Sequence, residues 1–472
     1  MKFQLKNDFF MDYSFLFNQS FGVRREDLVS YGNRIRRAVQ SVNYMREYGF
    51  RESDEKKDHP IYFPRLPYIE KEDGLFPSHE KKRLHILKER CGRGDFDIAV
   101  SIGIGGSYLG NQVLFDMVCG PFWNLMDKEE RRGRPQVFFA GENEDPEGLE
   151  ALLCHIRRCS AVHKNRLRIL ILVISKSGTT IEPMSALEVL SAQLQDMNVH
   201  VEYAAVTDPN KGYLHDLALK KDWIFFTVPE GIGGRFSVFS QVGLVFGAII
   251  GLDIADFLAG ARFIDKACKK TSVEENPALA AAVFRYAASE KYHIATEVIM
   301  PYGDSMRSLG QWYAQLLGES LGKKRNRRGE IVHYGRTPVS ALGSTDMHSL
   351  TQEHQEGPKN KLIQFVTVRE RRSDFCVSCG GERGSSALPM SDILNHAQQA
   401  NAEALASEGR MSCCLAMKNA DEFHLGGIMY FFCLCIAYEG ELSLVDAYDQ
   451  PGVETYKKIL KGYLRTGHVE NS

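Results

Sequence analysis

The sequence predicts an α/β protein of two doubly wound α/β/α lobes with parallel sheets, flanked by helices at both ends of the chain. Short runs of residues that are apolar on both faces recur along it, and segments of helical length separate them. Such runs are typical of buried parallel strands joined by crossover helices. The same alternation resumes after residue 240, which indicates a second lobe of the same kind, although no sequence repeat connects the two.

The expected strands of the first lobe follow one another at the spacing of strand–helix units. They lie at residues 96–102, 137–140, 167–174, 201–207 and 223–228. In the second lobe we expect strands at residues 293–300, 362–368 and 412–417, and helices at 306–321 and 391–407. Ligands of open α/β sheets bind beyond the carboxyl ends of the strands, so the loops there are the first places to examine for chemistry.

The length of 472 residues favours two lobes that share a seam, because it is too great for one simple domain. The four expected parts are an N-terminal helical segment with a connector (1–70), a first α/β domain (71–230), a second α/β domain (231–430) and a C-terminal helical segment (431–472). The connector at residues 59–67 contains three prolines and is expected to be extended. A long apolar helix at 423–438 and an amphipathic one at 453–464 close the chain.

The composition is that of a globular protein, with 44% hydrophobic and 25% charged residues, which is enough apolar material for a core. The 58 basic and 60 acidic residues leave a formal charge of −2, so no overall field attracts nucleic acid or an anionic membrane. The longest apolar stretch, residues 242–252, is too short to span a membrane, and the first residues lack the apolar core of a signal peptide. We therefore expect a cytoplasmic protein without nucleic-acid or membrane partners.

The eleven cysteines predict reduced thiols. Their number is odd, and most lie in apolar segments such as residues 432–436, where a thiol packs as a small hydrophobic group. Cys376 and Cys379 have the spacing of a metal or redox pair, and Cys413 and Cys414 offer two more thiols. Neither a clearly spaced second ligand pair nor a strand–helix start accompanies them, so we favour packing and predict no metal.

A glycine-rich segment follows the first expected strand and precedes a helix. It reads Ser101-Ile102-Gly103-Ile104-Gly105-Gly106-Ser107. Glycines allow a tight turn, and the free backbone N–H groups at a helix start attract an anion. The segment resembles a dinucleotide fingerprint, but the sixth position counted from Gly103 is Tyr108, which argues against NAD. By itself this is a weak signal.

A second segment combines hydroxyl groups with the start of another helix. It reads Ser175-Lys176-Ser177-Gly178-Thr179-Thr180-Ile181-Glu182-Pro183. Hydroxyls and successive backbone amides at a helix N-terminus form a cradle for a dianionic phosphate, and Lys176 adds positive charge. Serine and threonine are also ordinary helix caps, but this segment has more hydroxyls than a cap needs. A P-loop kinase is disfavoured, since Gly322-Lys323 is followed by Lys324 and not by Ser or Thr.

Four segments are informative mainly through their order. They are residues 175–182, Gly233-Gly234-Arg235-Phe236-Ser237-Val238, Gln315-Leu316-Leu317-Gly318-Glu319-Ser320, and Tyr448-Asp449-Gln450-Pro451-Gly452-Val453-Glu454-Thr455-Tyr456-Lys457. In this order they resemble the signatures of the glucose-6-phosphate isomerase family, whose lobes are of the sugar-isomerase type. The resemblance extends over most of the chain after residue 95. Four ordered motifs are far harder to match by chance than one.

The resemblance implies roles for individual residues. The substrate phosphate would be held by Gly106, Ser107, Ser175, Ser177 and Thr180, with Lys176 beside it. The sugar would contact Arg235 at its reacting carbons, Glu319 as the base, and Gln315, Gln450 and Lys457 along its length. His348 resembles the ring-opening histidine, which in this family reaches the site from the neighbouring subunit of a homodimer.

The chemistry of an aldose–ketose isomerase agrees with these residue types. Moving a carbonyl between C1 and C2 requires a base that takes a proton from one carbon and returns it to the next, which a single carboxylate such as Glu319 can do. Gln315 lies four residues earlier on the expected helix and shares its face. Arg235 would stabilise the enediolate without losing a proton, while His348 and Lys457 would move the protons of ring opening. Only proton transfers are needed, so no cofactor is predicted.

The sequence therefore predicts reversible conversion of D-glucose 6-phosphate to D-fructose 6-phosphate through a cis-enediolate, a step of glycolysis and gluconeogenesis. Two alternatives stay open: a related isomerase that also accepts mannose 6-phosphate, and a non-catalytic sugar-phosphate sensor. A sensor would need none of Glu319, Arg235 and His348. Taken one at a time, each of these residues is more simply a surface or packing residue. Positions that flank the motifs depart from the family pattern at Gly231, Gln241 and Ser443.

Overall fold

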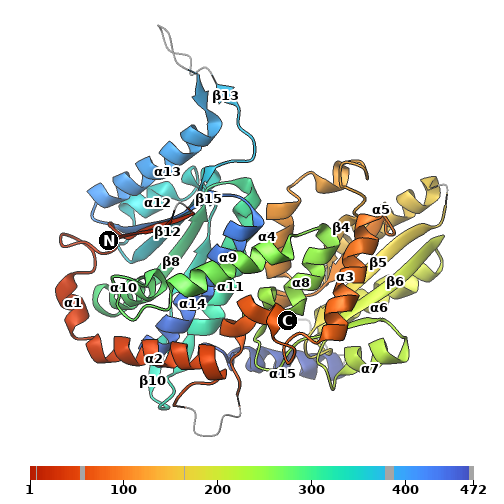
Figure 1. Cartoon of the computed structure of the whole chain (residues 1–472), viewed down its shortest axis with the longest axis horizontal. Helices are drawn as coiled ribbons and strands as arrows, with labels where there is room; N and C mark the ends of the chain where they lie inside the picture. The colour runs from red at the N-terminus through yellow and green to blue at the C-terminus, as the bar shows by residue number, and fades with distance from the viewer. Residues whose placement is uncertain (7, 54–58, 164, 378–386, 467–472) are drawn as a thin grey trace.

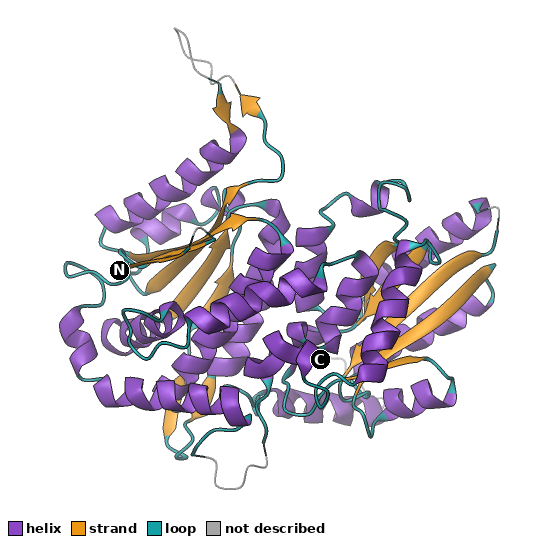
Figure 2. Cartoon of the chain, viewed as in Figure 1, coloured by secondary structure: helices purple, strands orange, loops and turns teal. Residues whose placement is uncertain are grey.

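The computed structural model describes residues 1–6, 8–53, 59–163, 165–377 and 387–466, and it has the predicted α/β class. Figure 1 shows two bodies side by side, each built around a twisted sheet, and Figure 2 shows helices on both sides of the sheets. Both sheets contain parallel strands connected by helices.

The first sheet contains five parallel strands in the order β4-β3-β5-β6-β7. They are β3 (Ile98–Ile102), β4 (Gln136–Ala140), β5 (Leu167–Ser175), β6 (Val199–Thr207) and β7 (Ile224–Thr227). The helices of this lobe are α3 (Ser78–Gly92), α4 (Leu109–Val118), α5 (Pro146–Val162), α6 (Ile181–Gln195) and α7 (Tyr213–Lys220). All five predicted strands are confirmed. The strand order reverses between β3 and β5, and such a switch point is where doubly wound sheets bind ligands.

The second sheet has the order β1-β2-β15-β12-β8-β11. Its parallel strands are β8 (Thr296–Pro301), β11 (Thr337–Ser340), β12 (Lys361–Glu370) and β15 (Met411–Asn419). Its helices are α11 (Arg307–Leu321), α12 (Thr351–Glu356) and α13 (Met390–Ser407). The neighbouring strands β11, β8, β12 and β15 come second, first, third and fourth of these strands along the chain, and so do the neighbouring strands β4, β3, β5 and β6 of the first sheet. The two lobes therefore share a topology without a sequence repeat.

The N-terminal segment differs from its prediction. Strands β1 (Lys2–Leu5) and β2 (Phe9–Asp12) pair antiparallel with each other, and β2 pairs antiparallel with β15, so the helical prediction was wrong there. Helices α1 (Arg25–Val29) and α2 (Gly32–Tyr48) follow. The connector is also less extended than expected, because a 3₁₀ helix covers Phe63–Lys71, with Pro64 near its start. The division into four parts stays a prediction, but the hairpin belongs to the second sheet.

The longest buried helix is α14 (Glu422–Ser443), which packs against α2, α9 (Ile254–Ala267), α10 (Pro277–Tyr292) and α11. By length and composition it could cross a membrane, but its apolar window is 100% buried inside the protein. It is therefore a core helix. The stretch that the sequence marked as most apolar is the shorter α8 (Gln241–Ile250), whose residues are likewise buried.

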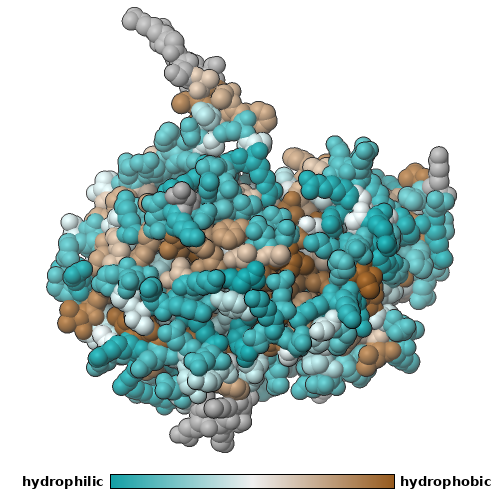
Figure 3. All heavy atoms as spheres, viewed as in Figure 1, coloured by the Kyte–Doolittle hydropathy of each residue, from teal (hydrophilic) through white to brown (hydrophobic). Residues whose placement is uncertain are grey.

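Two short hairpins and a C-terminal helix complete the chain. The hairpins are β9 (Lys323–Arg325) with β10 (Ile331–Tyr334), and β13 (Cys376–Val377) with β14 (Leu388–Pro389). Helix α15 (Val453–Thr466) has the amphipathic pattern that was predicted, yet Tyr456, Ile459 and Tyr463 are exposed on it. The face seen in Figure 3 is mostly hydrophilic, with hydrophobic residues gathered near its middle.

Candidate active site

Three segments from both lobes converge so closely that only glycine fits between them. They are the turn Gly105–Ser107 after β3, the turn Gly234–Phe239, and helix α11. A Cβ on Gly106 would lie 2.1 Å from the carbonyl carbon of Gly234 and 2.7 Å from the Arg235 nitrogen. Gly105 has a φ of +57°, and a Cβ there would lie 2.9 Å from Nε2 of Gln315. The glycine-rich motif thus lets the backbone approach the residues of the other motifs.

Arg235 is the centre of this cluster, and it is only 2% exposed. Its guanidinium donates hydrogen bonds to Oγ of Ser320 (2.6 Å), to Oε2 of Glu319 (3.4 Å) and to Oε1 of Gln450 (2.9 Å). It also donates to the carbonyl oxygens of Ala447 (2.5 Å) and Asp449 (2.9 Å). Burial lowers the pKa of Arg235, and Glu319 opposes this shift. The guanidinium is therefore a fixed positive charge that joins α11 to the loop before α15.

Glu319 and Gln315 lie on one face of the last turns of α11, as their spacing predicts. Nε2 of Gln315 donates to Oε1 of Glu319 at 3.2 Å, while Arg235 approaches the other carboxylate oxygen. The Glu319 side chain is 34% exposed, so a ligand can reach it. Oε1 of Gln315 is buried and has no hydrogen-bond partner among the described residues. A carboxylate is thus held between a cation and an amide, with one side open.

Two residues of this cluster were not among the predicted site residues. Ser320 accepts the bond from Nε of Arg235. Lys323 donates to the carbonyl oxygens of Glu319 (2.5 Å) and Asp449 (2.9 Å), and burial, together with the nearby Arg235, lowers its pKa. The sequence feature that could have identified Lys323 is its position four residues after Glu319, at the end of a helix, where a lysine can donate hydrogen bonds to the last carbonyl oxygens. Lys323 thus connects Glu319 to the Asp449 loop.

The predicted phosphate cradle is one loop at the carboxyl end of β5. Ser177 Oγ lies 3.1 Å from Thr180 Oγ1, and the Gly178 nitrogen donates to Ser175 Oγ at 3.2 Å. Ser177 is exposed, and α6 begins directly after Thr180. Lys176 donates to the carbonyl oxygen of Ile232 at 3.0 Å. This bond connects the cradle to the residues just before the turn that carries Arg235. Ser107, the other serine predicted to bind the phosphate, lies beside Gly106 in the turn after β3.

His348 and Lys457 do not join the cluster. His348 follows the 3₁₀ turn Thr345–Met347 and is exposed, and no hydrogen bond or ion pair is described between it and Arg235 or Glu319. Lys457 lies on α15, where it is 45% exposed and pairs with Glu454 at 3.4 Å. Among the described residues, the cluster around Arg235 therefore includes Glu319, Gln315 and Gln450, but neither His348 nor Lys457.

The positions that depart from the family pattern have local explanations. Gly231 has a φ of +76°, and a Cβ there would lie 2.6 Å from the carbonyl oxygen of Pro60, so this turn requires glycine. Gln241 is fully buried and donates to the carbonyl oxygen of Leu75 and to Glu80. Ser443 donates to the carbonyl oxygen of Glu439 within α14. None of the three has a described hydrogen bond to Arg235, Glu319 or Gln315.

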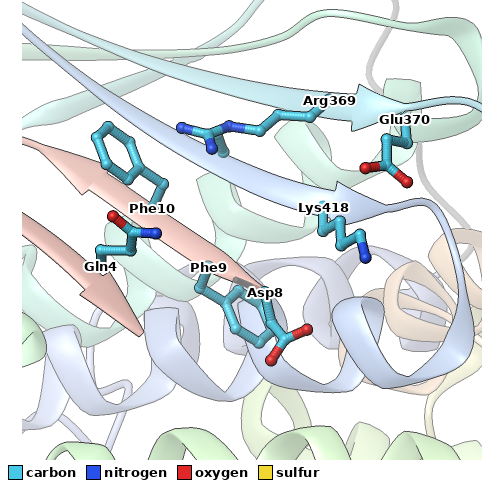
Figure 4. Close-up of a pocket in the computed structure, with 8 residues that line it drawn as sticks. Gln4, Asp8, Phe9, Phe10, Arg369, Glu370 and Lys418 are labelled. Atoms are coloured by element: carbon cyan, nitrogen blue, oxygen red, sulfur yellow. The ribbon is translucent and has the colours of Figure 1, made fainter. Parts of the chain in front are cut away.

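A cavity of about 250 Å³ lies elsewhere, between the N-terminal hairpin and the ends of β12 and β15 (Figure 4). Its charged walls are balanced, with Asp8 and Glu370 against Arg369 and Lys418, and the Arg369 guanidinium lies 4.4 Å from the Phe10 ring centre. No predicted site residue lines it.

The described part of the chain contains free thiols and no cluster of metal ligands. Among the described residues, no group of three or more His, Cys, Asp or Glu side chains is placed to hold a metal ion. The ten described cysteines are free and six are buried, Cys413 among them, as packing thiols should be. Cys379 of the predicted pair lies outside the described residues.

Comparisons with known proteins give relatives that match most of this chain. A family model described as phosphoglucose isomerase matches residues 90–379. A glucose-6-phosphate isomerase of Carboxydothermus hydrogenoformans is 35% identical over 432 residues, which cover 89% of this chain and 88% of the relative. One of Rubrobacter xylanophilus is 32% identical over 469 residues, 98% of each chain. Among solved structures, a hypothetical protein of Thermus thermophilus has a TM-score of 0.77 at 26% identity, covering 96% of this chain and 99% of that one. A glucose-6-phosphate isomerase of Chlamydia trachomatis has a TM-score of 0.80 at 22% identity, covering 97% and 89% respectively, and it supports the fold alone.

Proposed function

This chain belongs to the phosphoglucose isomerase family, and on that premise we propose how its residues interconvert D-glucose 6-phosphate and D-fructose 6-phosphate. It is an aldose–ketose isomerase, and the reaction belongs to glycolysis and gluconeogenesis. The observation that carries the proposed mechanism is the cluster of Arg235, Glu319, Gln315 and Gln450, which draws on three segments far apart in the sequence.

The substrate phosphate binds at the start of α6. Ser177 and Thr180 present neighbouring hydroxyls there, and the free N–H groups of the first helical turn add a positive potential. Ser175 shapes the loop through its bond to Gly178. Lys176 adds charge and fixes the distance from the cradle to the Arg235 turn. Ser107 and Gly106, in the turn after β3, contribute further contacts to the phosphate.

Glu319 takes the proton from one carbon and returns it to the next. Gln315 and Arg235 hold its two oxygens in place, so the carboxylate faces the substrate in a fixed orientation. Arg235 lies beside the oxygens on which negative charge develops in the cis-enediolate. A guanidinium keeps its proton at neutral pH, so it stabilises this charge without competing for the transferred hydrogen. Gln450, bonded to Arg235, orients the sugar hydroxyls.

Ring opening uses His348 and Lys457. It needs one group that protonates the ring oxygen and another that removes the anomeric proton, and both residues are of the right chemical type. Both are exposed in the single chain. A homodimer explains this arrangement for His348, because the partner copy then brings that side chain to the open side of Glu319. We also assign the enzyme to the cytoplasm, where its hexose phosphate substrates occur.

The test of the base is Glu319→Gln, which keeps the size and the bond from Gln315 but removes the charge. We expect kcat to fall by about 10²–10⁴-fold, the usual contribution of a positioned base. The same variant should lose exchange of the substrate C2 hydrogen with deuterated water, followed by NMR. Glu403→Gln is the matched control, since Glu403 accepts a bond from Gln399 on α13 with the same spacing. Near-normal turnover in Glu319→Gln would reject the mechanism.

The site across the interface is tested by mixing two inactive variants, Glu319→Gln and His348→Ala. If His348 acts in the partner's site, each mixed dimer contains one intact site, and random mixing restores about a quarter of wild-type activity. If His348 acts within its own chain, every site carries a lesion and mixing restores nothing. This second result would contradict the shared site while leaving the role of Glu319 intact.

A further inference from the structure

A second cavity, of about 170 Å³, lies where three neighbouring parallel strands of the second sheet begin. Lys361 is the first residue of β12, Met411 is the first of β15, and Ile294 precedes β8 by two positions. None of the residues that line this cavity belongs to the candidate active site. Its polar side chains are those of Tyr292, His354, Lys359, Lys361 and Arg410, and no aspartate or glutamate lines it.

Three of these basic groups are buried to an extent that is unusual for cations, while Lys359 is exposed at the rim. Arg410 is 7% exposed, His354 is 3% exposed, and the Lys361 side chain is 13% exposed. One carboxylate approaches them: Glu353, which pairs with Lys361 at 2.7 Å from outside the lining. Lys359 and Arg410 bond only to carbonyl oxygens, of Glu408 and Gly357. Lys361 is thus paired and Lys359 exposed, so the buried cation without a carboxylate is Arg410, and burying such a charge is costly unless an anion binds beside it.

Two polar groups in the wall also lack partners. Nε of Arg410 is buried without a hydrogen-bond partner among the described residues. The His354 ring makes no hydrogen bond within the same part of the chain, although its backbone belongs to α12. Buried polar groups in native proteins nearly always have a partner. An arginine fork, a lysine ammonium and an imidazole together match the oxygens of a phosphate or a sulfate.

The size of the cavity limits the ligand. A water molecule occupies about 30 Å³ and pockets for drug-sized molecules measure about 300–1,000 Å³, so 170 Å³ holds a group of a few heavy atoms. We propose that this cavity binds a tetrahedral oxyanion, either inorganic phosphate or the phosphoryl group of a small metabolite, at a site separate from the substrate phosphate. The site adjoins the reaction machinery in sequence, because α12, which carries His354, begins three residues after His348.

The proposal is tested by counting phosphate ions per chain in equilibrium dialysis with radiolabelled inorganic phosphate. We expect two per chain in the wild type, one at the cradle and one here. Lys361→Met should remove one, and Ser177→Ala with Thr180→Ala should remove the other. Lys418→Met, in the same sheet but at the other cavity, should leave both and serves as the control.

The outcomes separate this proposal from the proposed function. One phosphate per chain that survives in the cradle variant but is lost in Lys361→Met supports this site and contradicts the cradle. One phosphate that is lost in the cradle variant and kept in Lys361→Met overturns this site and leaves the cradle intact. Repeating the dialysis with the substrate sugar phosphate distinguishes the two sources, since a phosphoryl-metabolite site also retains the sugar phosphate in the cradle variant.

The pH dependence of sulfate binding gives a second readout, because the charge of sulfate is constant between pH 5 and 8. Burial lowers the pKa of His354, Glu353 opposes this, and Lys361 and Arg410 add to the lowering. The empty site thus keeps His354 neutral, and an anion favours its protonation. Tyr292 also lines this cavity, and burial together with Asp27 raises the pKa of its phenol to about 12, so the phenol stays protonated over this range. We expect sulfate affinity to rise by up to about tenfold per pH unit on acidification, and to be flat in His354→Gln. A flat wild-type profile would overturn the part assigned to His354.

Discussion

Replacing Arg235 by lysine tests whether a fixed guanidinium, and not merely a positive charge, is required. Arg235 donates five hydrogen bonds, to Ser320, Glu319, Gln450, and the carbonyl oxygens of Ala447 and Asp449. A lysine ammonium has three donors and cannot reach the same acceptors in one plane. At least two charge-assisted bonds are therefore lost, and three of the five acceptors lie in the loop at 447–450.

The magnitudes separate a structural from a catalytic effect. Each hydrogen bond to a charged group contributes about 1.5–3 kcal/mol, so two lost bonds lower the stability of this region by up to about 3–6 kcal/mol. Loss of one preorganised donor at a developing oxyanion costs about 10²–10³-fold in kcat. We expect Arg235→Lys to lower the melting temperature moderately, and to reduce kcat by at least about 100-fold while KM changes little.

The assay couples fructose 6-phosphate isomerisation to oxidation of the glucose 6-phosphate formed, with thermal unfolding measured on the same preparations. The control is Arg336→Lys. Arg336 is equally buried, at 4% exposure, and it bonds Glu297 and Glu439 outside the candidate site. Both variants should lose stability, but only Arg235→Lys should lose kcat. The reasoning is refuted if folded Arg235→Lys retains kcat within about tenfold of wild type, or if Arg336→Lys loses as much.

Two further predictions concern the loops around the site. Gly106→Ala should reduce activity at least about tenfold, since its Cβ would meet the Gly234 carbonyl carbon at 2.1 Å. The control is Gly148→Ala, which should be neutral because a Cβ there has no neighbour within 4 Å. Equal activities of the two variants in the kinetic assay would contradict the close approach of Gly106 to Gly234. Asp446 should hold its loop only while its carboxylate is ionised. Burial raises the pKa of Asp446, but the ion pair with Arg51 lowers it by more, so the pKa lies below its ordinary value. A lowered folded pKa contributes stability that is complete above the unfolded value of about 3.9 and is lost as pH falls through the folded value. The free energy of unfolding, measured with urea from pH 7 to pH 3, should therefore fall less steeply with pH in Asp446→Asn than in the wild type. The same pH dependence in both proteins would show that the Asp446–Arg51 pair does not contribute to it.

Strands that are buried on both faces could be predicted from the sequence almost residue by residue. The apolar run at 167–174 is β5 (Leu167–Ser175), and nearly every residue of that strand is buried. Because both faces of such a strand are buried, nearly every position requires an apolar residue, and a short apolar run in the sequence therefore identifies the strand. The same holds for the core helix α14, although its length of 22 residues exceeds the predicted range.

Strands at the edges of the second sheet were missed because their side chains carry a weaker signal. β1 alternates between exposed and buried residues over only four positions, and its partner β2 has a similar pattern. β11 contains Pro338, which argues against a strand in a sheet interior but is tolerated at an edge. Which short segment pairs with which edge is decided by tertiary contacts and not by local pattern.

The motifs predicted which residues gather around Arg235, but not how they are held. Lys323 and Ser320 connect α11 to Arg235 and to the Asp449 loop, and neither has a pattern that distinguishes it from a helix-end lysine or serine. Their importance comes from the meeting of segments more than 80 residues apart, Arg235 with Ser320 and Lys323 with Asp449. Contacts of this range leave no trace in local spacing.

Burial divides the proposed machinery into two halves with different physical requirements. Arg235 must hold its charge in one position, and burial at 2% exposure with five acceptors achieves this. His348 and Lys457 must exchange protons with a sugar that enters from water, and both are exposed. Glu319, at 34% exposure, lies between the two halves, because it needs a fixed orientation and also an open side for the substrate. A single folded chain can complete the buried half by packing alone, whereas the exposed half has no such force to position it. Substrate binding or a second copy of the chain must therefore supply the free energy that brings those residues to the base.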